Sequence, residues 1–195
     1  MTRRVFFSFH YDDVMRVQQI RQMGAFAGKE VVRFDDAAAY EKVKKHGDAA
    51  IKHWIRKQLN GTSVTVVLIG TNTWQRPYVR YEIEQSYLAG NGLLGIHING
   101  LLDVNQYRKP RGANPFASVR NPLNLSGGLG QPFMQSRQGL ESFMIQRPPG
   151  MFGQIRTTLE HKAKIYPAGL SSNDYAIIKA NIGNWIETAA QDVGR

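Results

Sequence analysis

The chain contains 195 residues with a formal net charge of +10, 42% hydrophobic and 21% charged residues, and no cysteine. This size and composition fit one globular domain with an appended segment, and the positive charge favours an anionic partner: a nucleic acid, a phosphorylated small molecule or an acidic protein. The lack of cysteine excludes disulfides, thiolate nucleophiles and Cys-ligated zinc. No apolar run approaches the roughly 18 residues of a membrane span, and the first run is too short for a signal peptide. We therefore expect a cytoplasmic protein without a membrane partner.

Short apolar runs, rich in β-branched and aromatic residues, alternate with helical patterns over the first hundred residues. Such runs are typical of strands buried on both faces. The predicted strands cover residues 5–9, 31–34, 64–69 and 93–98, and the predicted helices between them cover residues 13–23, 47–59 and 77–88. This alternation predicts an α/β fold with a parallel sheet and helices on both faces, while the strand order stays open.

The second half of the chain has a different texture. Residues 103–153 are rich in Gly, Pro, Asn, Gln, Ser and Arg without a helical or strand period, which favours a surface segment that acts as a lid or a partner contact. A second clear amphipathic stripe then follows, formed by Tyr175, Ile178, Ile182, Trp185, Ile186 and Ala189. We therefore predict an α/β domain over residues 1–116 and a loop-rich extension over 117–195, whose final helix packs on the same core.

The segment after the third predicted strand holds the leading catalytic candidate. The apolar run stops at Gly70, and the helical segment beyond it carries Tyr78 and Glu82 four residues apart, on one helix face. Ligands of parallel α/β sheets bind beyond the carboxyl ends of the strands. Glu82 could there stabilise a sugar-like cation or act as a general acid or base. The alternative is a surface glutamate that pairs with a basic residue one turn away.

The end of the first strand should reach the same sheet edge. Phe9, His10 and Tyr11 could grip an adenine or a phosphate there, but an ordinary βα loop is an equally good interpretation. For Asp12 and Asp13, which follow directly, we favour helix capping.

Other motifs are weaker. Asp35 and Asp36 end the second strand, where an acidic residue often contacts a ribose, but no GxGxxG precedes them and a turn role is at least as good. The five histidines are scattered without metal-binding spacing, so no metal is expected. His97, inside the fourth strand, is expected to be a core histidine with satisfied hydrogen bonds.

Four segments together resemble a known family. VFFSFHYDD, a strand ending in FDD, LNGTSVTVVLIGTNTWQRPYVRYEIEQS and GNGLLGIHINGLLD resemble the Toll-like TIR domain, and more closely the bacterial TIR-like branch of Thoeris anti-phage defence. The resemblance is good over residues 3–116, and GANPF and NWIETAA add to it. It implies a flavodoxin-like TIR fold, followed here by the loop-rich extension and its terminal helix.

The resemblance also implies an enzyme that cleaves NAD, with NAD as substrate and no cofactor. Enzymatic TIR domains use a glutamate in a Trp-x-x-x-Glu pattern, which here becomes Tyr78-x-x-x-Glu82 and keeps an aromatic ring. By this resemblance Glu82 is catalytic. The substrate-binding residues that it implies are Phe9, His10, Tyr11, Asp35 and Tyr78.

The implied chemistry is that of an NAD glycohydrolase or ADP-ribosyl cyclase. The product would be a cyclic ADP-ribose-type signal that diffuses to a separate effector, and the implied partners include a second copy of the chain and a phage-derived trigger. Two alternatives remain open. One is a non-catalytic TIR adaptor that docks an acidic protein; the other, nucleic-acid binding, ranks last because the basic residues do not cluster with aromatic ones.

Overall fold

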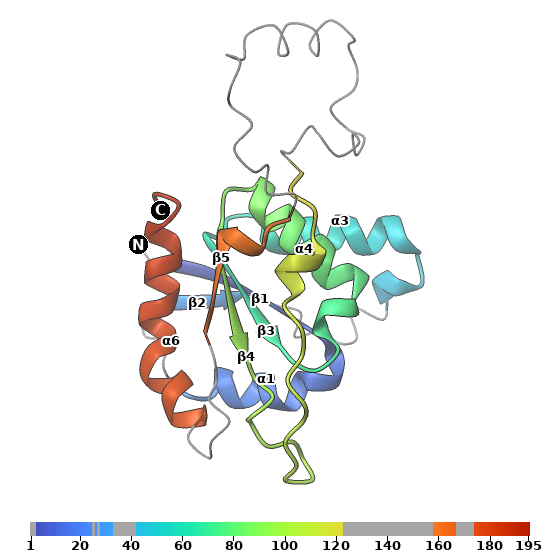
Figure 1. Ribbon diagram of the computed structural model, residues 1–195. Helices are drawn as coiled ribbons and strands as arrows, with labels where there is room; N and C mark the ends of the chain where they lie inside the picture. The colour runs from blue at the N-terminus through green and yellow to red at the C-terminus, as the bar shows by residue number, and fades with distance from the viewer. Residues whose placement is uncertain (1–2, 25, 27, 33–41, 123–157, 167–173) are drawn as a thin grey trace, which may run out of the picture.

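The computed structural model describes residues 3–24, 26, 28–32, 42–122, 158–166 and 174–195 (Figure 1). Its strands are β1 (Arg3–Phe9), β2 (Lys29–Val32), β3 (Val64–Ile69), β4 (Gly92–His97) and β5 (Ala163–Tyr166). They form one parallel sheet in the order β2-β1-β3-β4-β5. This is the strand order of flavodoxin-like folds, so the predicted fold class is confirmed and the strand order, left open by the sequence, is added.

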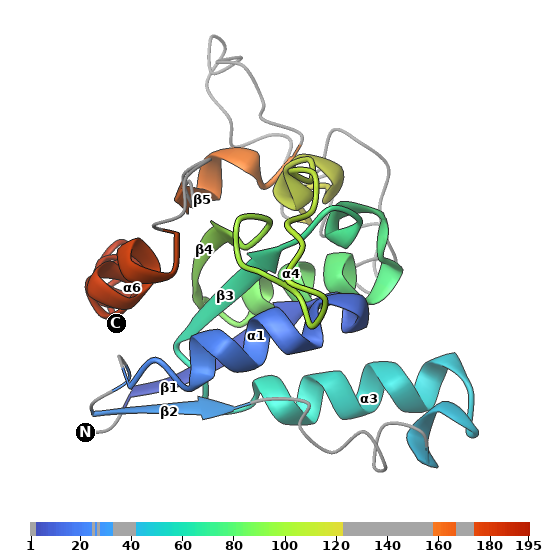
Figure 2. The ribbon, with the colours of Figure 1, turned by 90° about the horizontal axis from the view of Figure 1, so that it is seen from below.

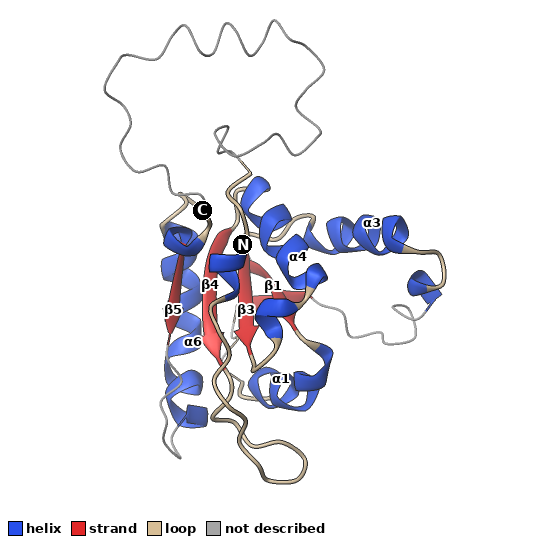
Figure 3. Cartoon of the chain, turned by 45° about the vertical axis from the view of Figure 1, so that its right-hand side comes forward, coloured by secondary structure: helices blue, strands red, loops and turns tan. Residues whose placement is uncertain are grey.

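Helices cover both faces of the sheet. They are α1 (Val14–Arg21), α3 (Asp48–Leu59), α4 (Pro77–Leu88) and α6 (Asp174–Gln191). Helices α1 and α6 pack on one face, and α3 and α4 pack on the other (Figures 2 and 3). Successive side chains of a strand point to opposite faces, so within β1 Phe7 joins the α1–α6 side and Phe6 joins the α3 side.

Most predicted elements agree with the structure. β3 and α4 have the predicted bounds, whereas β2 begins two residues earlier than predicted and is described only to Val32. The C-terminal stripe is the buried side of α6, with Tyr175 exposed and Trp185 stacked on Tyr166 at 4.3 Å between ring centroids. The sequence did not predict β5, which pairs with β4 and extends the sheet.

The segment that follows β4 lies over the carboxyl ends of β3 and β4. Thr71 Oγ1 donates a hydrogen bond to the Pro110 carbonyl at 2.6 Å. A Cβ added to Gly112 would lie 2.0 Å from the Gly70 carbonyl oxygen, so only glycine permits this close approach. The segment thus occupies the β3–β4 half of the carboxyl edge, and the end of β1 lies beside the start of α4 in the other half.

A buried arginine of α1 holds this segment in place. Arg16 is 1% exposed, and its Nε donates to the Leu101 carbonyl at 2.8 Å. A second nitrogen donates to the Tyr107 carbonyl at 3.0 Å, and the guanidinium forms ion pairs with Asp13 at 3.2 Å and Asp103 at 3.4 Å. The hydrogen bond from the Tyr107 backbone is the largest of the causes that lower the pKa of Asp103.

His97, at the end of β4, only partly fulfils its expectation. It is 3% exposed, and its Nε2 accepts a hydrogen bond from Arg111 at 3.2 Å. Its Nδ1 is buried without a hydrogen-bond partner among the residues that the structure describes. Burial, followed by the charge of Arg111, lowers the pKa of His97 to about 4. The histidine is therefore a neutral, half-satisfied core residue rather than a fully satisfied one.

Replacement of Arg16 by methionine should destabilise the fold by about 3–5 kcal/mol, because it leaves the buried Asp13 carboxylate without its closest cation. The measurement is urea denaturation, with Arg80→Met as the control because Arg80 is an exposed arginine of α4 whose loss should cost about 0.5 kcal/mol or less. Equal midpoints for the two variants would contradict the structural role of Arg16.

The pKa of His97 predicts a pH-dependent contribution to stability. Because His97 is harder to protonate in the folded state, the unfolded state binds more protons between about pH 6.5 and about pH 4. This contribution is complete above that window and is lost as the pH falls through it, by roughly 3 kcal/mol. Denaturation at about pH 7 and pH 4.5 should show a smaller loss for His97→Gln than for the wild type. Equal losses of stability in His97→Gln and the wild type would contradict the lowered pKa of His97.

Candidate active site

Glu82 lies in the interior, on the side of α4 that faces the sheet. The buried residues of this helix are Val79, Glu82, Ile83 and Ser86, and Glu82 itself is 4% exposed. The interpretation as a surface glutamate is therefore wrong. A carboxylate in a position that otherwise suits an apolar side chain carries a desolvation cost, and such groups concentrate at functional sites.

Ser8 of β1 contacts the Glu82 carboxylate directly. Ser8 Oγ donates a hydrogen bond to Glu82 Oε2 at 2.5 Å, and Ser8 is 1% exposed. Ser8 lies one residue before the end of β1, so this hydrogen bond places the carboxylate just inside the carboxyl edge of the sheet. A hydrogen bond to a charged acceptor is among the stronger ones, and it orients the carboxylate as well as stabilising it.

Two further hydroxyl groups support the same turn of α4. Ser86 Oγ donates to the Glu82 main-chain carbonyl at 2.6 Å, and Thr65 Oγ1 of β3 donates to Ser86 Oγ at 2.8 Å. The contact of Thr65 is therefore with the helix backbone through Ser86, whereas Ser8 contacts the carboxylate directly. Variants of Ser8 and Thr65, both buried, can therefore separate the effects on catalysis from the effects on stability.

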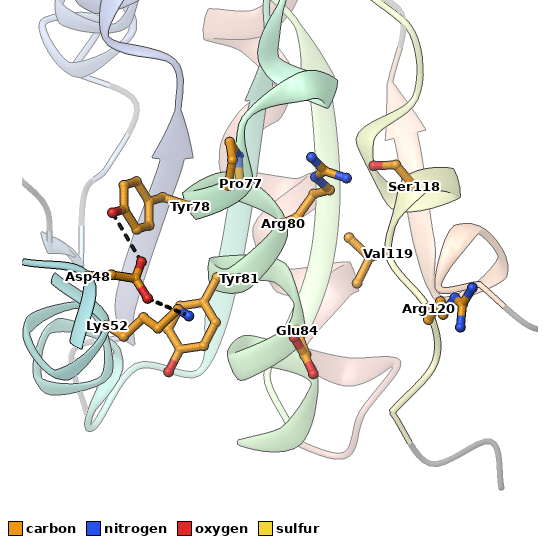
Figure 4. Close-up of a pocket in the computed structure, with 10 residues that line it drawn as sticks. All are labelled: Asp48, Lys52, Pro77, Tyr78, Arg80, Tyr81, Glu84, Ser118, Val119 and Arg120. Atoms are coloured by element: carbon orange, nitrogen blue, oxygen red, sulfur yellow. Dashed lines mark hydrogen bonds and ion pairs between the residues drawn. The ribbon is translucent and has the colours of Figure 1, made fainter. Parts of the chain in front are cut away.

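Tyr78 lies one helical turn before Glu82 and leans towards α3. Its ring packs beside the cluster of Phe6 and Ile55, and its hydroxyl donates to Asp48 Oδ1 at 3.2 Å. Figure 4 shows Tyr78 and Tyr81 directed at α3 along the rim of a surface pocket of about 350 Å³. Glu82 does not line this pocket. Tyr78 thus borders both the outer pocket and the buried side of α4.

His10 and Tyr11 lie directly beyond β1. His10 is half-buried, with its Nδ1 at 3.4 Å from Asp12 Oδ2. Burial is the main cause that lowers its pKa; Arg76 and Lys109 lower it further, whereas Asp12 and Asp13 raise it. The imidazole is therefore neutral near pH 7 and carries no charge of its own for a phosphate. Tyr11 is 67% exposed and available to a ligand.

Phe9 and Asp35 stand apart from this group. Phe9 is 7% exposed and belongs to the core cluster on the α1–α6 face, opposite to the face on which Ser8 meets Glu82. Asp35 lies outside the described residues, so its role stays a prediction. Sequence reasoning missed Ser8, Arg76 and Lys109, although Ser8 was the only polar side chain in the run VFFSF.

The chemistry open to this site is electrostatic. The carboxylate can stabilise a developing cation or accept a proton. Within the described ranges, no group of three His, Asp or Glu residues could hold a metal ion. Nor does the described part of the chain contain a helix with the length and apolarity of a membrane span.

Comparisons with known proteins bear on the family of this chain. The model of the family described as Thoeris protein ThsB, TIR-like domain, matches residues 6–103, a range that includes residues 6–9 of β1, all of β3 and α4, and both Ser8 and Glu82. A relative from Bacillus cereus (strain MSX-D12), named "Putative cyclic ADP-D-ribose synthase ThsB1", is 45% identical over 119 residues, which are 60% of this chain. The chain spans 62% of the length of that relative. With a matching family model over half of its length and the flavodoxin-like strand order, this chain belongs to the TIR-like domain family of the Thoeris protein ThsB.

Proposed function

We propose that the protein is an NAD-cleaving enzyme of anti-phage defence that makes a cyclic ADP-ribose-type signal. The observation that carries this proposal is the buried carboxylate of Glu82, held by Ser8 just inside the carboxyl edge of the sheet. Membership of the ThsB family and the name of the Bacillus cereus relative support it.

The proposed reaction breaks the bond between nicotinamide N1 and ribose C1′. The bonding electron pair moves to the nicotinamide nitrogen, which neutralises the pyridinium and releases neutral nicotinamide. C1′ becomes an oxocarbenium-like cation, and the Glu82 carboxylate stabilises it electrostatically. A carboxylate that is already oriented by Ser8 and shielded from water needs little reorganisation when this charge develops.

The fate of the cation sets the product. Water adds to C1′ and loses a proton to give ADP-ribose, whereas a hydroxyl or nitrogen of the same ADP-ribose adds and loses a proton to give a cyclic product. Holding the adenosine half close to C1′ favours the cyclic route through effective concentration, and exclusion of water favours it further. The cyclic product would then diffuse through the cytoplasm to a separate effector.

The burial of Glu82 bears on activation. Since only 4% of this residue is exposed, the nicotinamide ribose reaches the carboxylate only after a movement at the end of β1 or the start of α4. We propose that self-association, or a phage-derived trigger, drives this movement, because a ligand or partner that binds the open form shifts the equilibrium towards it.

Glu82→Gln should lower the rate of NAD cleavage by about 10²–10³-fold, because it keeps the size of the side chain and removes the charge that stabilises the cation. The matched control is Glu84→Gln, a partly exposed glutamate of the same helix, which should cleave NAD at the wild-type rate. Nicotinamide release is measured by chromatography, and mass spectrometry should find a product one water lighter than ADP-ribose.

Equal rates for Glu82→Gln and the wild type would contradict the catalytic role. The assay is repeated with lysate of phage-infected cells, so that an enzyme awaiting its trigger is detected. A protein that binds a partner and leaves NAD intact under both conditions would be an adaptor instead.

Ser8→Ala should lower kcat by about tenfold or more and leave KM unchanged, since the hydrogen bond that it removes is worth about 1.5–3 kcal/mol and orients the carboxylate. Thr65→Val removes a comparably buried hydroxyl that touches Ser86 and not the carboxylate. It should reduce thermal stability as Ser8→Ala does, but keep kcat. Loss of kcat in both variants would mean that Ser8 acts through the fold alone.

A further inference from the structure

Two cationic side chains lie beside the end of β1, outside the residues that the resemblance assigns to substrate binding. Arg76 comes from the start of α4, and Lys109 comes from the segment that covers the carboxyl edge. A chain of contacts links them. Lys109 Nζ is 3.8 Å from Asp13 Oδ1, the Asp13 carboxylate lies against Gly70, and the Arg76 amide donates to the carbonyl of Thr73 on the loop after Gly70.

Arg76 forms no ion pair with any residue that the structure describes. Its Nε is buried without a hydrogen-bond partner among the described residues, and no ion pair within those residues involves its guanidinium. Arg76 is also the N-cap residue of α4, and no side chain caps this helix. Pro77 contributes no amide proton, but those of the following residues point out of the helix end, where the dipole favours an anion. The amino end of α4 and the guanidinium of Arg76 therefore both contribute positive charge at the start of this helix.

Lys109 is held by its backbone and shares its acidic neighbours with Arg16. Its amide donates to the Asn99 carbonyl at 3.1 Å. Its ammonium is 3.8 Å from Asp13 Oδ1, whereas the buried Arg16 is 3.2 Å from the same oxygen. The charge of Lys109 also helps to lower the pKa of Asp103, a smaller cause than the hydrogen bond from the Tyr107 backbone, and Asp103 too forms an ion pair with Arg16. The Lys109 side chain remains 36% exposed, so its ammonium can reach a ligand at the carboxyl edge.

Arg76 and Lys109 both lie close enough to His10 to affect the ionisation of its imidazole. Both Arg76 and Lys109 lower the pKa of this one imidazole, in addition to the larger effect of its burial. Arg76 precedes Glu82 by six residues on the same helix, which is about 9 Å along the axis. A ribose bound at Glu82 and the extended side chain of Arg76 together cover this distance between the two residues.

We infer that Arg76 and Lys109 form an anion-binding pair beside His10 and hold the diphosphate of the dinucleotide while its nicotinamide ribose lies against Glu82. This inference rests on the proposed function and assigns the charged part of the substrate to two residues. A diphosphate carries two negative charges, which match two cations and one helix N-terminus. With a neutral His10, these groups supply the positive charge at this end of β1.

The test is isothermal titration calorimetry with ADP-ribose, which carries the diphosphate and has no nicotinamide bond to cleave. Arg76→Gln and Lys109→Gln should each weaken binding about tenfold or more, because each removes a charge-assisted contact. Arg76→Lys should lose less than Arg76→Gln. Arg80→Gln, one turn further along α4 and exposed, is the matched control and should bind as the wild type does. Inorganic pyrophosphate should displace ADP-ribose from the wild type.

Wild-type affinity in both Gln variants, or no binding of ADP-ribose by a folded wild type, would overturn the inference. Thermal denaturation of each variant checks that a lost affinity is not a lost fold. NAD turnover in the same preparations separates the two proposals. Glu82-dependent cleavage with unchanged affinity in the variants would contradict the anion site alone. Charge-dependent binding without cleavage, also in lysate of infected cells, would contradict the enzyme and support the anion site.

Discussion

The hydrogen bond between Ser8 and Glu82 joins β1 to α4 in the interior of the protein. An isolated carboxylate in such a place would cost several kcal/mol of desolvation, so a neighbouring donor is a condition of its burial. The hydroxyl of Ser8 provides that donor from within the apolar run at the end of β1. Stability alone would be served better by an apolar residue at position 82, and this conflict between local packing and residue type is what marks the position as functional.

The remainder of the carboxyl edge is arranged around this position. Arg16 and Gly112 fix the segment after β4 over the ends of β3 and β4, which leaves the end of β1 beside the start of α4. That same segment delivers Lys109 to the edge, while α4 delivers both Arg76 and Glu82. One helix and one clamped segment can therefore position the charged and the reacting parts of a dinucleotide, in a fold whose ligands bind at this edge.

Sequence patterns predicted the elements whose signals were local. The run 64–69 and the helix that begins at Pro77 match the structure, because continuous apolarity and a proline at the first turn act within a few residues. β5 was missed because Ala163–Tyr166 is a four-residue edge strand that is only partly buried. The partner of Ser8 lies 74 residues away, and no local pattern predicts such a pair. The position of Phe9, by contrast, follows from a local pattern, because the alternation of side chains along β1 puts it on the face opposite to Ser8.

The most direct test of the central claim is a crystal structure of the Glu82→Gln protein with NAD, since this variant keeps the shape of the site and should bind the substrate without cleaving it. The expected result is a dinucleotide at the carboxyl edge, with ribose C1′ against residue 82 and the diphosphate between Arg76 and Lys109. A dinucleotide bound instead in the outer pocket between Tyr78, Tyr81 and α3 (Figure 4), away from residue 82, would contradict it.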